Sequence, residues 1–213
     1  MSYYVIVDLE MCNVPKSVKK DVFKCRNEII QIGAVLVNGS LEIVDEFMTY
    51  VSPEYGRIDD YIQKLTGITE KDLCGAPRIK EALEMLVAWM PEDAVAVSWS
   101  DNDKCQISRE LQAKGIVIQG LDAYLESWID CQKTFAEKMN SRKCYKLSEA
   151  LIIADIFYDD GEHDALVDAK NTAQLFIKME KEPVLRLNPY YSNQVNQTAY
   201  CPFAKLLASY KPA

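Results

Sequence analysis

The first third of the chain alternates apolar runs with polar turns, a pattern that predicts β-strands. Each run contains the β-branched and aromatic residues that favour strands, and Asn38-Gly39 is a strong hairpin signal between the second run and the third. The three predicted strands cover residues 3–7, 29–37 and 41–51. We therefore expect the fold to open as an antiparallel three-stranded meander.

The rest of the chain favours helices separated by short strands. The predicted helices cover residues 79–90, 103–114, 147–156 and 164–181. Gly115 is a stop signal for the second helix, and Ser148 is a candidate N-cap for the third. Residues 94–99 predict a short buried strand, whereas residues 121–129 fit either a strand or a helix. This order predicts an α/β fold with a mixed sheet and helices on both of its faces.

Composition predicts one domain with an appendage. The chain has 213 residues, of which 49% are hydrophobic, enough for a sizeable core. We assign residues 1–182 to the domain. Residues 183–213 differ because they contain no acidic residue but several aromatic and basic ones. We expect this tail to pack on the domain or a partner, and the alternative is that its aromatic rings stack on bases.

Cysteines and hydropathy narrow the class of protein. The seven cysteines are odd in number and include no C-x-x-C pair, so we expect reduced thiols rather than disulfides or a zinc site. No apolar run approaches the ~18 residues of a membrane span, and the N-terminal residues show no basic n-region or cleavage site of a leader. We expect a cytoplasmic protein without a membrane partner, and a homodimer is compatible with this sequence.

Charge limits how the chain would contact nucleic acid. The net charge of −8 argues against a protein that coats long polymers by bulk electrostatics. Two segments are nevertheless basic: the residues between Asn13 and Glu28 include five cations against a single acid, Asp21, and residues 133–146 form the second. Such segments are typical of solvated surfaces, and the functional alternative is contact with phosphates.

Two carboxylates close the first predicted strand. Asp8 and Glu10 are two residues apart, so their side chains point to the same face of a strand. Like charges this close raise each other's pKa unless a cation lies between them. The pair is therefore a candidate seat for a divalent metal ion, although acidic pairs are also common at the ends of surface strands.

Two later segments add candidate chemistry. Asp101 and Asp103 follow the strand at 94–99, at a strand-to-helix junction where α/β sheets bind ligands, and either could instead cap the helix. His163 is the chain's single histidine, and an imidazole accepts protons near neutral pH. Five residues separate it from Asp168, so we place His163 in the loop before the last helix.

The ordered set of these residues resembles the DEDDh (DnaQ-like) family of 3′→5′ exonucleases. The resemblance covers about residues 3–180 and is closest to the KapD and Eri-type branch, whose W-x3-D motif identifies Asp103, rather than Asp101, as the metal-binding acid. The supporting segments are Asn27-Glu28-Ile29-Ile30-Gln31-Ile32-Gly33-Ala34, Leu65-Thr66-Gly67-Ile68-Thr69, Trp99 to Asp103, and His163 to Ala173.

The resemblance implies an RNase H-like fold with two divalent cations, Mg²⁺ or Mn²⁺. In the family's scheme Asp8 bridges both ions, Glu10 and Asp168 complete the side of the nucleophile, and Asp103 serves the other ion. His163 takes the proton from the attacking water. Hard oxygen ligands suit these metals, and two ions ~3.5–4 Å apart activate the water and hold the leaving oxygen.

The resemblance also suggests substrate contacts. Family members hold the terminal nucleotide with the residues after D-x-E and with the T-G-I-like segment, so the candidates are Met11, Cys12, Thr66 and Ile68. Two positions depart from the family pattern: Cys12 stands where relatives often have threonine, and Val167 where they often have an acid.

We expect a metal-dependent 3′→5′ exonuclease that releases nucleoside 5′-monophosphates from single-stranded DNA or RNA or from short oligonucleotides. One alternative is a catalytically silent module of the same fold that binds nucleic acid or protein. Another is a phosphatase or an RNase H-like endonuclease, which would use the same acids but give other products.

Overall fold

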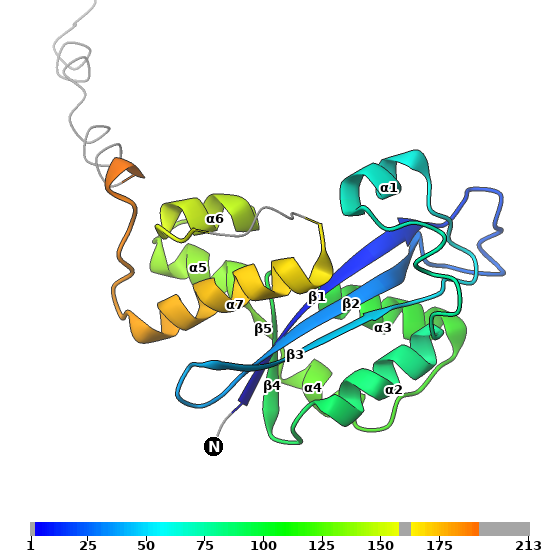
Figure 1. Cartoon of the computed structure of the whole chain (residues 1–213), viewed down its shortest axis with the longest axis horizontal. Helices are drawn as coiled ribbons and strands as arrows, with labels where there is room; N and C mark the ends of the chain where they lie inside the picture. Colours follow the sequence, from blue (N-terminus) through cyan, green and yellow to red (C-terminus); the bar gives the residue numbers. More distant parts are fainter. Residues whose placement is uncertain (1–2, 158–162, 192–213) are drawn as a thin grey trace, which may run out of the picture.

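A computed structural model describes residues 3–157 and 163–191, and its centre is one five-stranded sheet of order β3-β2-β1-β4-β5 (Figure 1). The strands are β1 (Tyr3–Asn13), β2 (Asn27–Val37), β3 (Ile43–Tyr50), β4 (Ala94–Ser98) and β5 (Ile129–Asp130). β1, β2 and β3 pair antiparallel, and β4 pairs parallel with both β1 and β5. The predicted opening meander is therefore confirmed.

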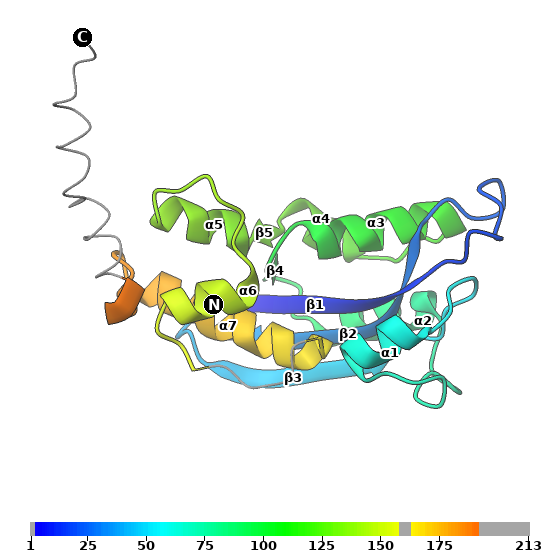
Figure 2. The same ribbon diagram turned by 90° about the horizontal axis from the view of Figure 1, so that it is seen from above.

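Helices cover both faces of the sheet, as predicted. They are α1 (Asp60–Thr66), α2 (Ile79–Trp89), α3 (Asn102–Lys114), α4 (Leu121–Glu126), α5 (Cys131–Lys138), α6 (Leu147–Ile153) and α7 (Ala165–Lys181). Alternation along β1 divides the core: Val5 and Val7 pack with α2, α3 and α4, whereas Ile6 packs with α5, α6 and α7. Figure 2 shows α3 and α7 on different sides of β1.

Several local predictions need correction. Residues 121–129 contain both alternatives, because α4 is followed directly by the short β5. The Ser148 cap is wrong: α6 begins at Leu147, and Lys146 occupies the N-cap position. Helices α1 and α5 were not predicted. Each has fewer than nine residues and buries at most two side chains, so its apolar periodicity is weak.

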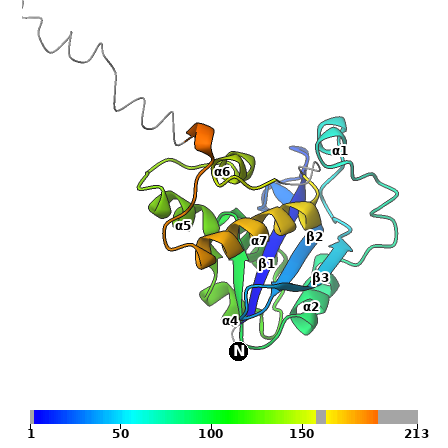
Figure 3. The same ribbon diagram turned by 60° about the vertical axis from the view of Figure 1, so that its left-hand side comes forward.

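Gly33 on β2 seats the start of α7 against the sheet. A Cβ atom at this position would lie 2.2 Å from the carbonyl carbon of Ala165 and 2.3 Å from the nitrogen of Leu166, so only a glycine permits this approach. α7 crosses the face formed by β1 and β2 (Figure 3). Because Gly33 pairs with Asp8 of β1, the first turn of α7 lies beside the end of the apolar run.

A buried ion network ties α3 to β2. The Lys114 ammonium lies 2.6 Å from Glu28 and 3.0 Å from Glu110, and all three side chains are nearly inaccessible to solvent. Burial alone would raise the pKa of Glu28, but hydrogen bonds from Lys114 and from backbone N–H groups of residues 54–56 lower it. These acids therefore have a cation supplied by the fold.

The first part of the predicted tail packs on the domain. Leu185 is buried against the α5–α7 side of the core, and the N–H of Asn188 donates to the carbonyl of Ile153 at 2.8 Å. Residues 192–213, including Cys201, lie outside the described residues, so the domain boundary stays a prediction. The six cysteines in the described part are free thiols. No helix there is long and apolar enough to cross a membrane.

Candidate active site

Asp8 and Glu10 lie on the face of β1 that α7 covers. Val5, Val7 and Leu9 face the opposite core, so the alternation of the strand puts the two acids together beyond Ile6. β4 pairs with β1 only as far as Ile6, and the two acids therefore stand just past the end of the parallel pair. This is the sheet edge at which α/β folds bind ligands.

Asp103 reaches the same place from the first turn of α3. Its buried carboxylate accepts a hydrogen bond from the N–H of Leu9, which lies between the two acids of β1. Asp101 is different, because its carboxylate pairs with the exposed ammonium of Lys133. The structure thus places Asp103, and not Asp101, in the acid cluster.

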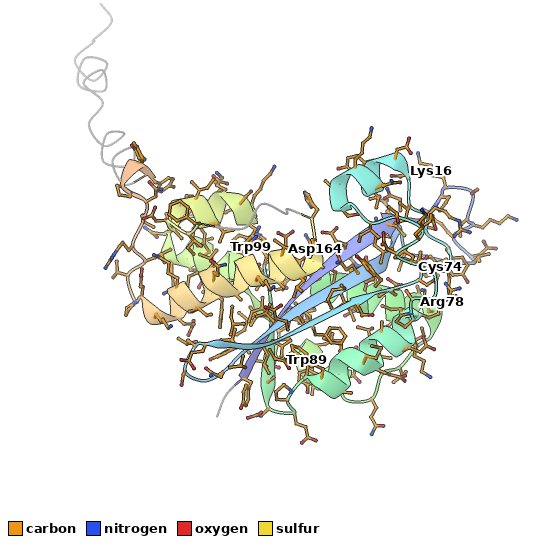
Figure 4. All side chains as sticks on the ribbon, in the orientation of Figure 1. Lys16, Cys74, Arg78, Trp89, Trp99 and Asp164 are labelled. Atoms are coloured by element: carbon orange, nitrogen blue, oxygen red, sulfur yellow. The ribbon has the colours of Figure 1, made fainter. Side chains whose placement is uncertain are left out.

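His163 and Asp168 come from the start of α7. Asp164, labelled in Figure 4, lies at the start of α7. It caps this helix by accepting hydrogen bonds from the N–H groups of Leu166 at 3.0 Å and Val167 at 3.1 Å. The N–H of His163 donates to the carboxylate of Asp168 at 3.0 Å. His163 has a φ of 72°, so the backbone turns sharply here and the histidine precedes the helix, as expected.

The four acids, Asp8, Glu10, Asp103 and Asp168, repel one another. Burial, together with the charges of Asp168 and Asp103, raises the pKa of Glu10 to about 8. Burial and the other three acids raise the pKa of Asp8 well above its ordinary range, and burial raises that of Asp103 to about 7. Within the described residues, no lysine or arginine forms an ion pair with Asp8, Glu10 or Asp103. A cation from solution would relieve this repulsion.

The donor atoms suit a divalent metal ion. Glu10, His163 and Asp168 each offer one ligand atom, and these atoms all lie within 4.8 Å of one another. Carboxylate oxygens dominate the set, as Mg²⁺ and Mn²⁺ prefer. Asp8 and Asp103 are outside this closest group but act on it through their charge. The residues present therefore fit a metal centre.

Two hollows meet at the acid cluster. One, of about 420 Å³, extends past Met11 and Asn27 toward Tyr61 and Leu65, and we call it the α1 hollow. The other, of about 510 Å³, extends between α6 and α7. Both are lined by Asp8, Trp99, Ser100, Asn102, His163 and Asp168. The acids can therefore be reached from two directions.

The predicted substrate contacts divide into two groups. Met11 lines the α1 hollow, whereas Cys12, Thr66 and Ile68 line neither hollow. Cys12 is fully buried, and burial with the charge of Glu28 raises the pKa of its thiol to about 12. The structure corrects this assignment, because Cys12 packs in a small core cluster with Ile30 and Ile62, and a Cβ atom at Gly56 would lie 2.3 Å from its sulfur.

The other two assignments fail for a related reason. The hydroxyl of Thr66 donates to the carbonyl of Ile62 and accepts from the N–H of Ile68, so it closes the end of α1 instead of facing the hollow. Ile68 is buried in a small core cluster. The α1 side chains that do line the hollow belong to Tyr61, Ile62 and Leu65.

Two polar residues near the site were missed as functional candidates. Gln31 pairs with Glu10, donates to Asp164 at 3.1 Å and accepts from the N–H of Ala165 at 3.1 Å. Asn171 lies one turn after Asp168, lines the hollow beside α6, and its buried side-chain oxygen has no hydrogen-bond partner within the described residues. Gln31 could have been found from the sequence, because a glutamine inside an apolar strand is buried and needs hydrogen-bond partners.

Comparison with known proteins agrees with this geometry. The model of the RNase_T exonuclease family matches residues 5–176. The chain is 32% identical to the DNA polymerase III epsilon subunit of Aquifex aeolicus, with 89% of this chain and 87% of that protein covered. It is 28% identical to the 3′-5′ exonuclease Snipper of Drosophila melanogaster, with 86% and 71% covered. Other curated relatives are longer, and the chain spans half of their length or less.

A solved structure shares the fold over nearly the same region. The nuclease domain of 3′hExo, a DEDDh family member bound to rAMP, is 25% identical with a TM-score of 0.71, and 87% of this chain and 96% of that one are covered. The chain belongs to the RNase_T exonuclease family. The predicted RNase H-like fold and the predicted 3′-5′ exonuclease class are confirmed, and its relatives support nucleic acid as the substrate class.

Proposed function

We propose that this chain is a 3′→5′ exonuclease that binds two divalent ions, Mg²⁺ or Mn²⁺, and releases nucleoside 5′-monophosphates from single-stranded DNA or RNA or short oligonucleotides. The observation that carries the proposal is the cluster of Asp8, Glu10, Asp103 and Asp168 beside His163, in which burial and mutual repulsion raise the pKa values of Asp8, Glu10 and Asp103. Family membership gives these residues their order along the chain.

The proposed roles follow from position. Asp8, Glu10, Asp103 and Asp168 would hold the ions, which when bound lower the pKa of a water and neutralise charge on the leaving oxygen. We assign His163 to proton acceptance rather than metal ligation, because Mg²⁺ and Mn²⁺ prefer oxygen ligands. Its place at the turn before α7 lets it face the hollows that meet at the acids.

The terminal nucleotide is proposed to enter the α1 hollow. Met11 and Leu65 supply apolar contact there, and Asn13 and Asn27 supply amide groups. Ribose and deoxyribose differ by one hydroxyl, and amides are suited to sense it. A homodimer and a cytoplasmic location also stay proposals.

Degradation of a 5′-labelled oligonucleotide in Mn²⁺ or Mg²⁺ tests the function. We expect labelled products that shorten one nucleotide at a time, together with free nucleoside 5′-monophosphate. Asp8→Ala and His163→Ala should each lose activity, by about 10²–10⁴-fold for the proton acceptor. Asp101→Ala is the matched control, because Asp101 adjoins the cluster but faces Lys133.

Other outcomes would identify the alternatives. Tight binding without hydrolysis would indicate a silent binding module, and internal cuts or free phosphate would indicate an endonuclease or a phosphatase. Unchanged hydrolysis in both Asp8→Ala and His163→Ala would overturn the proposed site.

A further inference from the structure

A third hollow, separate from the acid cluster, lies between α3 and the loop that follows β1. Its volume is about 620 Å³. The loop contributes Lys24 and Arg26, the helix contributes Gln106 and Arg109, and Asn27 lies between them. We call it the basic hollow. Figure 4 labels Lys16 on the same loop, at the far end of β1 from the N-terminus.

The cations of the basic hollow have no internal counter-ion. Lys24, Arg26 and Arg109 are exposed, and within residues 3–157 and 163–191 none of them forms an ion pair. Asp21 is the single acid among the lining residues. Lys133 in the other basic segment differs, because Asp101 and Asp130 both pair with it. A local excess of positive charge in a chain of net charge −8 indicates an anionic ligand.

The loop that presents these cations is anchored. The N–H of Val14 donates to the carbonyl of Arg26 at 2.8 Å, and the Cys25 thiol donates to the carbonyl of Arg109 at 3.2 Å. Phe23 is buried and stacks on Tyr55 with ring centroids 4.7 Å apart. The backbone that carries these cations is therefore held in place, which reduces the entropy lost when a ligand orders the loop.

The basic hollow adjoins the α1 hollow, which the acid cluster lines. Asn27 lines both this hollow and the α1 hollow, and its carbonyl accepts a hydrogen bond from Gln106 at 3.0 Å. α3 begins at the acids and runs along the basic hollow. Asp103 and Arg109 are six residues apart, or ~9 Å along the helix axis. That distance is roughly three phosphates of a stacked strand at ~3.4 Å each, and fewer of an extended one.

We propose that the basic hollow binds the phosphodiester backbone of single-stranded nucleic acid a few nucleotides upstream of the scissile bond. The inference rests on the proposed function for the position of the 3′ end. Arginine forks suit phosphate oxygens, and two of the three cations are arginines. The hollow thus favours substrates long enough to span it, while the acids alone act on the terminal nucleotide.

A triple variant, Lys24→Gln, Arg26→Gln and Arg109→Gln, tests the proposal in the full chain. The matched control is Lys80→Gln, Lys181→Gln and Arg186→Gln, which removes the same charge from residues that line none of the three hollows. Each protein is assayed in Mn²⁺ with a dinucleotide and with an oligonucleotide of about 12 residues, which fills a typical single-strand site.

We expect the triple variant to raise KM for the longer substrate on the order of tenfold to a hundredfold, with kcat little changed. The slope of log KM against log salt should fall by about two, since each single-strand phosphate contact contributes ~0.7. The KM for the dinucleotide and both constants of the control should stay within about twofold of wild type. Equal weakening of both substrates, or of neither, would overturn the proposal.

A binding measurement separates this proposal from the proposed function. Fluorescence anisotropy with the same labelled oligonucleotide, on an Asp8→Asn background without divalent ions, needs no hydrolysis. If the wild type fails to cut any oligonucleotide, the exonuclease proposal fails. The basic hollow still stands if the triple variant weakens binding on the order of tenfold more than the control, and it fails if the two bind alike.

Discussion

Two clusters of buried acids lie at opposite ends of α3, and they differ in whether the protein itself provides a cation for them. Near the end of the helix, Glu28 and Glu110 enclose the ammonium of Lys114. At its start, Asp103 joins the other acids with no lysine or arginine paired to it in the described residues. The first cluster is completed by the fold and stabilises it. In the second, Asp8, Glu10 and Asp103 pair with no described lysine or arginine, as expected of a site that takes its cations from solution.

The pKa values of Glu28 and Glu10 show the same contrast. The pKa of Glu28 is lowered although burial opposes this, because Lys114 and backbone N–H groups hold its charge, whereas burial still raises the pKa of Glu110. The pKa of Glu10 is raised to about 8, because burial and neighbouring acids both disfavour its charge. Burial alone therefore does not distinguish a structural acid from a functional one. The identity of the neighbours does.

The largest expected effect separates activity from stability. Asp103→Asn should lower kcat on the order of 10³-fold or more, since it removes several kcal/mol of metal-dependent stabilisation of the transition state. Metal-free Asp103→Asn should be at least as stable as wild type, because the amide removes a repelled charge. Activity assays and urea unfolding in EDTA measure both. Asp101→Asn is the control for activity, and a strongly destabilised Asp103→Asn would contradict the comparison.

Removing the internal cation should have the reverse effect. Lys114→Met leaves Glu28 and Glu110 buried without their partner, which should lower the free energy of unfolding by about 3–5 kcal/mol. Lys133→Met is the matched control, because its two ion pairs are exposed and should contribute at most ~1 kcal/mol. Equal losses in the two variants, measured by urea unfolding, would show that burial of the network is unimportant.

The contact between β2 and the start of α7 can be changed without replacing any of the four acids. Gly33→Ala places a Cβ against the backbone of Ala165, and it should cost about 1–3 kcal/mol and lower activity on the order of 10²-fold by shifting His163 and Asp168. Gly115→Ala is the control: it has a φ of 65° but open space around it, so it should cost ~1–2 kcal/mol with activity intact. Similar activity in both variants would show that Gly33 does not position His163 and Asp168.

The smallest effect is the pH dependence of metal-free stability. The pKa values of Glu10 and Asp103 are raised to about 8 and about 7, so these groups stabilise the fold when protonated. Their contribution is complete below their ordinary pKa values and is lost as the pH rises toward 8. Glu28, whose pKa is lowered, acts in the opposite direction and loses its contribution in acid.

Thermal unfolding in EDTA measures this pH dependence. The Tm should fall by a few degrees between about pH 5.5 and 8.5, at ~2–4 °C per kcal/mol for a domain of this size. Glu10→Gln should make the decrease of Tm with pH smaller. Glu28→Gln should lower the Tm at every pH in this range without changing the size of that decrease. A Tm that rises over this range in wild type would contradict the assignment of raised pKa values.

The sequence predicted the acidic residues and the histidine of the site better than the residues that line the hollows around them. Asp8 and Glu10 follow the apolar run of β1, which continues to Asn13 instead of ending at the predicted residue 7, and Asp103 lies in the first turn of α3. The structure brings them together with His163 and Asp168. Family membership was readable from the same ordered residues. These features depend on local spacing and on the order of elements, which a single sequence contains.

The residues that line the hollows are set by packing between distant parts of the chain, which the local sequence pattern does not reveal. Cys12 is buried by a core cluster that includes Ile62 and by the approach of Gly56, which lies 44 positions later in the chain. Thr66 is used by the end of α1, a helix too short to show clear periodicity. The link from Gln31 to Asp164 joins residues 133 positions apart.

Titration with Mn²⁺ tests the central comparison most directly. Calorimetry on metal-free wild type, Asp103→Asn and Lys133→Met asks whether the cluster without an internal cation takes one from solution. We expect saturable binding in wild type and Lys133→Met, and affinity weakened about tenfold or more in Asp103→Asn, as for loss of a metal-site group. Wild type that binds no Mn²⁺, or Asp103→Asn that binds it equally well, would contradict the account.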